Sequence, residues 1–133
     1  MRATGIVRRI DDLGRVVIPK EIRRQMKIRE GDPLEIYTTN DGCVCFKKYE
    51  ADIDWDIIRK VVRTVLTCGF AILNRYEEVK VAVGGVHVTD YKIFEVRYEG
   101  DIVAYLKVNR ASVEDCSKQI FEAIKIIGAF FED

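Results

Sequence analysis

Turn signals divide the first fifty residues into pieces that are each too short to bury a core. Asp11-Asp12-Leu13-Gly14 predicts a tight turn, because Asp accepts hydrogen bonds from nearby backbone and Gly tolerates a positive φ. Asn40-Asp41-Gly42 predicts a hairpin turn, and Pro19 suits the first position of a helix. We therefore expect strands over residues 5–10 and 15–18, a helix over 20–27, and strands over 34–39 and 43–48.

A unit of about fifty residues rarely buries enough surface to fold alone. Neither a disulfide nor a metal site is expected to stabilise this small unit. Cys43 and Cys45 lie two apart, so on a strand they share a face and cannot easily bridge, and with Cys68, Cys116 and the lone His87 they lack zinc-site spacing. We expect free thiols, no metal and no cofactor. The remaining route to stability is pairing with a second copy, so the first unit is predicted to be an obligate dimer.

The rest of the chain carries a second pattern after a short polar joint at residues 50–54. Apolar spacing predicts helices over 53–68, ended by Gly69, and from an N-cap at Ser112 onward. Strands are expected over 70–73, 79–83, 93–98 and 102–108, giving an α-β-β-β-β-α unit. The apolar stripe on each helix is wider than one small sheet needs. We expect the helices to cover the sheet and also to pack against another subunit.

Composition and motifs argue against a membrane-spanning protein, a secreted protein and an enzyme. Hydrophobic residues make up 48% of the chain, enough for a core. No apolar run is long enough to span a membrane, and the amino terminus lacks a secretory pattern, so we expect a cytoplasmic protein without a membrane partner. Residues 53–133 show no nucleophile–base pair, metal cluster or phosphate-binding loop, and Gly84-Gly85 is too weak a signal. We therefore expect no enzyme activity and no catalytic residue.

Charge is distributed unevenly, although the net charge is zero. Residues 1–29 contain nine Lys/Arg against three Asp/Glu. Helical spacing places four cations on one face of the predicted short helix: Lys20, Arg23, Arg24 and Lys27. Like charges this close repel one another, so an anionic partner would explain the stripe better than water does.

The predicted first hairpin adds further cations. With Asp11 to Gly14 as the loop, Ile10 lies opposite Arg15, and Arg8 becomes a diagonal neighbour of Arg15. Arg9 points to the other face, and the hydroxyl of Thr4 could contact phosphate weakly. A basic stripe alone is more often a solvated surface than a site. Arginines that converge from two elements and are doubled in a dimer favour double-stranded DNA.

The segments 4–24, 28–36 and 47–49 closely resemble the amino-terminal domain of the AbrB/SpoVT transition-state regulators. The resemblance implies a swapped-hairpin fold, in which two chains interleave their strands into a barrel-like dimer. It also implies DNA binding through the arginines at four matching positions: Arg8, Arg15, Arg23 and Arg24. Arg9 and Lys20 occupy more variable family positions and are secondary candidates, together with Lys27 and Thr4.

The order of elements in residues 53–133 resembles a shortened form of the GAF-like domain of SpoVT-type members. That resemblance implies assembly into a tetramer. The missing length falls near residues 84–91, where a GAF domain covers its ligand pocket, which argues against small-molecule sensing. The overall expectation is an α+β protein with domains at 1–50 and 53–133.

The predicted function is that of a nucleoid-associated transcription regulator acting as an intertwined homodimer or homotetramer, and the resemblance suggests a sporulation role. Two alternatives stay open. One is a MazE-like antitoxin, although such proteins usually carry a disordered acidic tail, whereas the pattern of residues 53–133 predicts a folded region. The other is a ligand-sensing regulator that uses residues 53–133.

Overall fold

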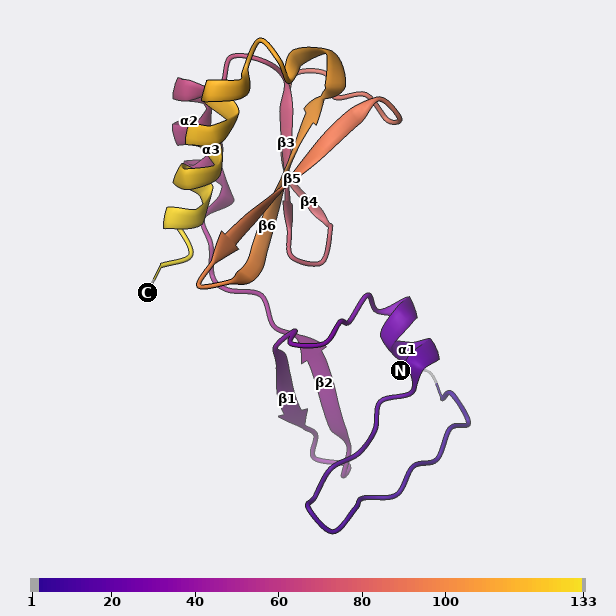
Figure 1. The fold of residues 1–133 in the computed structure, drawn as a ribbon. Helices are drawn as coiled ribbons and strands as arrows, with labels where there is room; N and C mark the ends of the chain where they lie inside the picture. The colour runs from indigo at the N-terminus through magenta and orange to yellow at the C-terminus, as the bar shows by residue number, and fades with distance from the viewer. Residues whose placement is uncertain (1–2, 133) are drawn as a thin grey trace. The chain divides into compact units, whose positions relative to one another are not determined.

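A computed structural model describes residues 3–132 and divides the chain into two compact units, one ending at Tyr49 and one beginning at Glu50 (Figure 1). The amino-terminal unit contains helix α1 (Lys20–Gln25) and strands β1 (Leu34–Thr38) and β2 (Val44–Lys48). The mixture of helices and strands in the chain confirms the predicted α+β class.

Strands β1 and β2 form the predicted antiparallel hairpin. Ile36 lies opposite Phe46, and Thr38 lies opposite Val44. The turn between them closes through a hydrogen bond from the Gly42 amide to the Thr39 carbonyl at 3.2 Å, with Gly42 at φ 90°. That φ is costly for a residue with a Cβ, which is why the hairpin signal around Gly42 was reliable.

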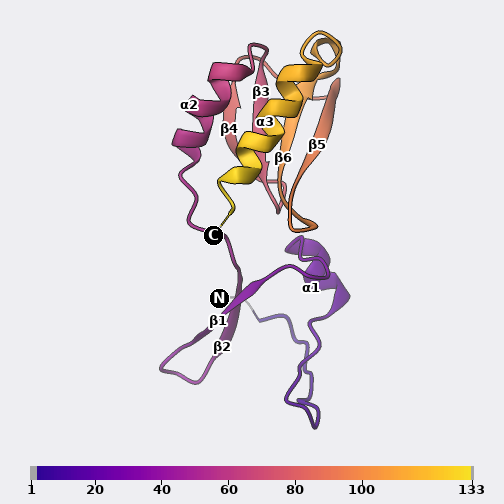
Figure 2. The ribbon, with the colours of Figure 1, turned by 60° about the vertical axis from the view of Figure 1, so that its left-hand side comes forward.

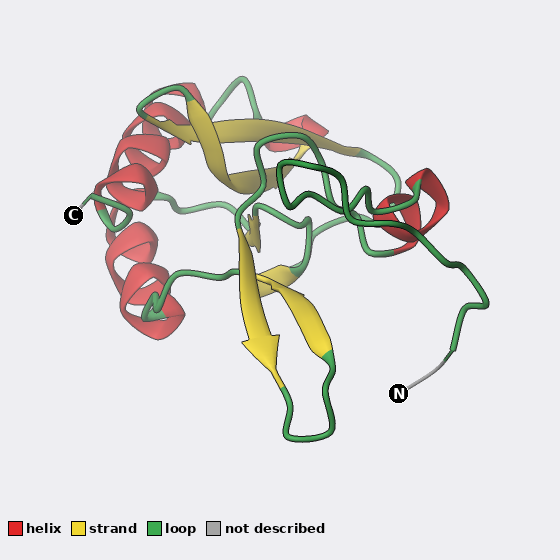
Figure 3. Cartoon of the chain, turned by 90° about the horizontal axis from the view of Figure 1, so that it is seen from below, coloured by secondary structure: helices red, strands yellow, loops and turns green. Residues whose placement is uncertain are grey.

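The strands predicted at residues 5–10 and 15–18 are wrong for the single chain. Neither segment pairs with another strand, and Figure 3 draws the segment before α1 as loop. The side chains have strand-forming character, but a strand needs a neighbour to satisfy its backbone, and the described part of this chain offers none. Val7 remains 84% exposed and Val17 68% exposed, so these segments are apolar without being buried.

The turn at residues 11–14 is present, but its register differs from the expected one. The Asp11 amide donates to the Arg15 carbonyl at 3.0 Å, and the Gly14 amide donates to the Asp11 carbonyl at 3.1 Å. Asp11 therefore lies opposite Arg15, whereas we expected Ile10 there. A shift of one residue reverses side-chain faces along an extended segment, so the predicted neighbourhood of Arg8 and Arg15 is not supported.

The carboxy-terminal unit is a four-stranded antiparallel sheet covered on one face by two helices (Figures 1 and 2). Its strand order is β4-β3-β6-β5. The elements follow the predicted α-β-β-β-β-α order, with one short 3-10 helix added: α2 (Trp55–Val65), β3 (Phe70–Asn74), β4 (Val79–Val83), β5 (Tyr91–Tyr98), β6 (Asp101–Asn109), η1 (Arg110–Ser112) and α3 (Ser117–Ala129).

Three predicted helix boundaries of this unit are wrong. Helix α2 begins at Trp55 after the N-cap Asp54, not at residue 53. Gly69 does not end α2, because Leu66 is already extended and fully buried, and Arg63 Nη1 donates to the carbonyls of Leu66, Thr67 and Cys68. Ser112 does not cap the last helix. It ends η1, and α3 begins five residues later with no side-chain cap.

The core of this unit lies between the sheet and the helices. The ring of Trp55 at the start of α2 meets Phe131 edge-on, with 6.0 Å between ring centroids. Fully buried aliphatic and aromatic side chains fill the layer: Ile58, Val62, Leu66, Phe70, Ile72, Val96, Leu106, Val108 and Ile127. Among the described residues, no helix combines the length and apolar character that crossing a bilayer requires.

Candidate nucleic-acid interface

Helix α1 carries three of the candidate cations. It begins after Pro19, whose φ of −57° is helical, and its sequence KEIRRQ consists almost entirely of good helix formers. Lys20, Arg23 and Arg24 follow i, i+3, i+4 spacing, so the helix brings them to one face as predicted. Arg23 and Arg24 lie in the last turn, where positive charge interacts favourably with the helix dipole. All three are exposed.

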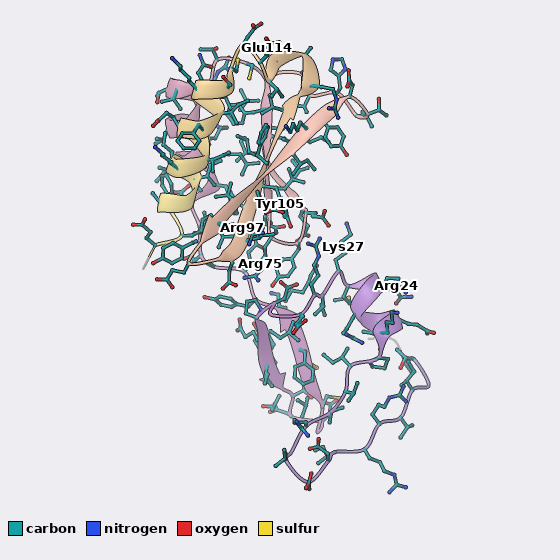
Figure 4. All side chains as sticks on the ribbon, in the orientation of Figure 1. Arg24, Lys27, Arg75, Arg97, Tyr105 and Glu114 are labelled. Carbon is teal, nitrogen blue, oxygen red and sulfur yellow. The ribbon has the colours of Figure 1, made fainter. Side chains whose placement is uncertain are left out.

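Lys27 does not belong to that helical stripe. The helix ends at Gln25, and Lys27 adopts φ 56°, which is the left-handed region. The expected i+7 position therefore does not exist. Figure 4 labels Arg24 on α1 and Lys27 just beyond it. Lys27 is exposed and stays a secondary candidate, but for its location near the helix end and not for helical periodicity.

Arg15 is tied to the turn that precedes it. Its Nε donates to Asp11 Oδ2 at 2.8 Å, and its backbone amide donates to Asp11 Oδ1 at 2.8 Å. These bonds, the backbone one first, lower the pKa of the Asp11 carboxyl below its ordinary value, so the carboxylate stays charged. Arg23 is tethered in a similar way, through a bond from its Nε to the Ile18 carbonyl at 3.1 Å.

The remaining candidates lie on the extended segment before the turn. Arg8 Nη1 donates to the Val7 carbonyl at 3.2 Å, and the Thr4 hydroxyl accepts from the Ile6 amide at 3.2 Å. Arg8, Arg9 and Thr4 are exposed. The structure thus distributes the candidates over four segments of the amino-terminal unit: the extended segment before the turn, the turn at Arg15, α1, and Lys27 beyond α1. Only the α1 trio shares one element. Convergence of all four arginines on one surface stays a prediction.

An open apolar hollow of about 400 Å³ lies within the same unit. Apolar side chains from before the turn, after the turn, α1 and β2 line it, among them Ile6, Val16, Ile22, Met26 and Phe46. Between residues 3 and 49 no side chain is buried at all. A folded unit with an empty apolar centre lacks its main source of stability.

Within residues 3–132, no three His, Cys, Asp or Glu side chains come together in a way that could hold an ion. All four cysteines are free thiols.

Comparison with known proteins identifies relatives of the chain. It is 52% identical over 93 residues to stage V sporulation protein T of Bacillus subtilis, and 48% identical over 61 residues to the transition state regulatory protein AbrB of the same species. The chain is homologous to SpoVT and AbrB. The SpoVT match is longer than either unit, so it includes residues of both.

These matches cover 68% and 46% of the chain, and the chain spans about half the length of SpoVT (52%) and 62% of AbrB. A family profile described as antidote-toxin recognition MazE, bacterial antitoxin, matches residues 7–45. The predicted resemblance of the first fifty residues to AbrB/SpoVT regulators is thereby confirmed.

Two solved structures also match the first part of the chain. One is the N-domain of the transcription factor AbrB, 52% identical, covering 39% of this chain and 98% of that one, with a TM-score of 0.36. The other is the N-terminal DNA recognition domain of B. subtilis AbrB, 50% identical, covering 41% of this chain and all of that one, with a TM-score of 0.33. Such TM-scores are too low to support a structural argument, so the relationship rests on sequence.

Asp11 was expected only as a turn residue, and its contact with the Arg15 side chain was not predicted. The available signal was an Asp and an Arg four residues apart across a turn that ends in Gly14. A turn of that kind brings both ends within side-chain reach.

Proposed function

We propose that the chain is a transcription regulator that binds double-stranded DNA through Arg8, Arg15, Arg23 and Arg24 of an intertwined pair of amino-terminal units. Homology to AbrB carries this proposal, since AbrB has an N-terminal DNA recognition domain. The exposed cations of α1 and of the 11–15 turn provide suitable chemistry. Guanidinium groups make paired bonds to phosphate and to guanine, so they orient a duplex as well as attract it.

The exposed apolar side chains of the amino-terminal unit support pairing with a second copy. The amino-terminal unit leaves many large apolar side chains exposed: Ile6, Val7, Ile10, Leu13, Val16, Val17, Met26, Ile36, Tyr37, Val44, Phe46 and Tyr49. In a swapped-hairpin dimer, segments 5–10 and 15–18 would gain strand partners from the other chain. Their side chains would fill the apolar hollow, and arginines of both copies would come to one surface.

The carboxy-terminal units would join two such dimers. Their helices retain exposed apolar side chains on the side away from the sheet, with Ile57 on α2 46% exposed and Phe121 on α3 60% exposed. Pairing through these helices would give a tetramer whose two DNA-binding heads act with avidity. The predicted kinship of this unit with GAF domains is part of the same proposal, as is association with the nucleoid.

A salt series on the full-length chain tests DNA binding. We expect affinity for a duplex to fall steeply with salt, with a slope of about −0.9 per phosphate contact in a plot of log affinity against log salt. The R23A/R24A variant should bind weakly and show a shallower slope. The matched control K60A/K118A removes the same charge from exposed helix positions of the other unit and should behave like the parent. A flat salt response, or equal losses in both variants, contradicts the proposal.

The MazE profile match gives one specific reason to test an antitoxin role. Antitoxins of that type hold a toxin with a disordered acidic tail, whereas residues after Glu50 form a packed sheet-and-helix unit here. Co-expression with a toxin encoded next to this gene would decide. Rescue of growth by the chain would favour the antitoxin role, and failure together with salt-dependent DNA binding would favour the regulator.

A further inference from the structure

Asp11 uses its two carboxylate oxygens for two different tasks. Oδ1 accepts the backbone amides of Leu13 and Arg15, at 2.9 and 2.8 Å, and so builds the turn. Oδ2 accepts Arg15 Nε at 2.8 Å and has no part in the turn backbone. The second bond is therefore separable from the first, and the turn does not require it.

We propose that Asp11 is a positioning residue of the DNA interface, which holds the Nε side of the Arg15 guanidinium and leaves both terminal nitrogens to the duplex. This inference rests on the proposed function. An exposed arginine has many rotamers, and fixing one of them on binding costs entropy. A tether that is already made in the free protein reduces that cost. Nε is the donor that such a tether can occupy while the terminal pair stays available for a bidentate contact.

Arg23 supports the same principle independently. Its Nε is also occupied by an acceptor of its own chain, the Ile18 carbonyl, at 3.1 Å. For both arginines, the described contacts engage Nε alone and neither terminal nitrogen. Two of the four candidate arginines are thus held in the same manner by different acceptors. A backbone carbonyl cannot be removed by substitution, so Asp11 is the residue on which the idea can be tested.

The opposite role for Asp11 predicts an effect of opposite sign. A carboxylate beside a phosphate-binding arginine repels the duplex and competes with phosphate for the guanidinium. If that were its main effect, neutralising Asp11 would raise DNA affinity and steepen the salt dependence. If Asp11 positions Arg15, neutralising it lowers affinity even though the protein becomes more positive. The direction of the change distinguishes the two.

Asp11→Asn is the decisive variant. The amide Oδ1 can still accept both turn amides, but its NH2 group is a donor and cannot accept from Arg15 Nε. Asp12→Asn is the matched control, because it removes the same charge from the same turn and no described contact joins Asp12 to Arg15. Each variant is measured on the full-length chain by fluorescence anisotropy with a duplex, alone and in an Arg15→Ala background, beside its thermal unfolding midpoint.

We expect D11N to bind about two- to thirtyfold more weakly than the parent, the range for losing an exposed ion pair in each of two copies. D12N should bind equally or more tightly, and D11N should cause no further loss once Arg15 is Ala. Tighter binding by D11N, in step with D12N, would overturn the inference while leaving the proposed function intact. An equal loss of affinity in the R15A background would also overturn the inference, since D11N would then act through the turn and not through Arg15. A parent chain that binds no duplex at all would contradict both the inference and the proposed function.

Discussion

Both units of this protein are rich in apolar residues but use them differently. In the carboxy-terminal unit, Phe70, Ile72 and Leu106 are fully buried between the sheet and the helices. In the amino-terminal unit, Ile36 and Phe46 face each other across a hairpin and are 63% and 47% exposed. The carboxy-terminal unit therefore completes its core within a single chain, whereas the amino-terminal unit supplies apolar side chains that need a second copy to bury them. The following variants test that contrast.

The largest effect is expected in the self-contained unit. Phe70→Ala removes a fully buried ring from β3 and should lower the free energy of unfolding by about 3–5 kcal/mol, because the cavity cannot collapse completely. Denaturant unfolding followed by circular dichroism measures it. The loss should not depend on protein concentration if the core belongs to one chain. A loss below about 1 kcal/mol would show that the contrast between the units is overstated.

The second effect concerns the exposed apolar side chains of the amino-terminal unit, which we propose form half of a core shared by two copies. Ile36→Asp changes a side chain that is exposed in a single chain, so a monomer should tolerate it within about 0.5 kcal/mol. If a second copy covers Ile36, the variant buries an unpaired charge and should dissociate the pair and abolish duplex binding. Native mass spectrometry measures the oligomeric state, and fluorescence anisotropy measures duplex binding. Val88→Asp is the control, since Val88 is 87% exposed in a loop of the other unit. If both variants keep the oligomeric state and the duplex affinity of the parent, the proposal that a second copy covers Ile36 is contradicted.

A third effect tests the close packing of loops within the carboxy-terminal unit. A Cβ on Gly69 would come within 2.7 Å of the Gly85 carbonyl oxygen, which is backbone and cannot move aside easily. Gly69→Ala should therefore destabilise the protein by about 1–3 kcal/mol. Gly85→Ala is the natural control, because its Cβ would meet no atom within 4 Å. Thermal unfolding of the two variants should differ, and identical midpoints would contradict this packing.

The smallest effect is chemical. Burial, and next a hydrogen bond with Cys116, raise the pKa of the Cys68 thiol to about 11. A raised pKa favours the protonated thiol in the folded state. Its contribution to stability is present below the ordinary pKa of 9.0 and is lost as the pH rises through about 11. Iodoacetamide labelling with peptide mapping should show slow modification of Cys68 until that pH, and faster modification in urea. Rapid labelling of the folded chain at pH 8 would contradict it.

Sequence predicted features that depend on neighbouring residues. The β1–β2 hairpin follows from Asn40-Asp41-Gly42, and β4 was expected at its observed bounds, 79–83. Boundaries set by distant contacts were missed. The 3-10 turn that delays α3 is held by Arg110, whose amide donates to the Asp90 carbonyl at 3.2 Å and whose side chain pairs with the Asp90 carboxylate. Such contacts leave no local pattern.

The candidate site was predictable in part for the same reason. Lys20, Arg23 and Arg24 share a helix face because helical spacing is local. The register of the 11–15 turn and the tether between Asp11 and Arg15 depend on which residues close the turn, and one residue of error there changes every face. The strands at 5–10 and 15–18 were expected from composition. A single chain cannot display them if their hydrogen-bond partners belong to another copy.

Hydrogen exchange on the full-length chain tests the central claim most directly, because it reports whether the backbone of residues 5–10 and 15–18 has partners. The account predicts strong protection of these amides at micromolar concentration and above, and loss of that protection in Ile36→Asp while β3 and β6 stay protected. Rapid exchange of both segments at concentrations where the chain binds DNA would contradict it, because the amino-terminal unit would then act without a completed core.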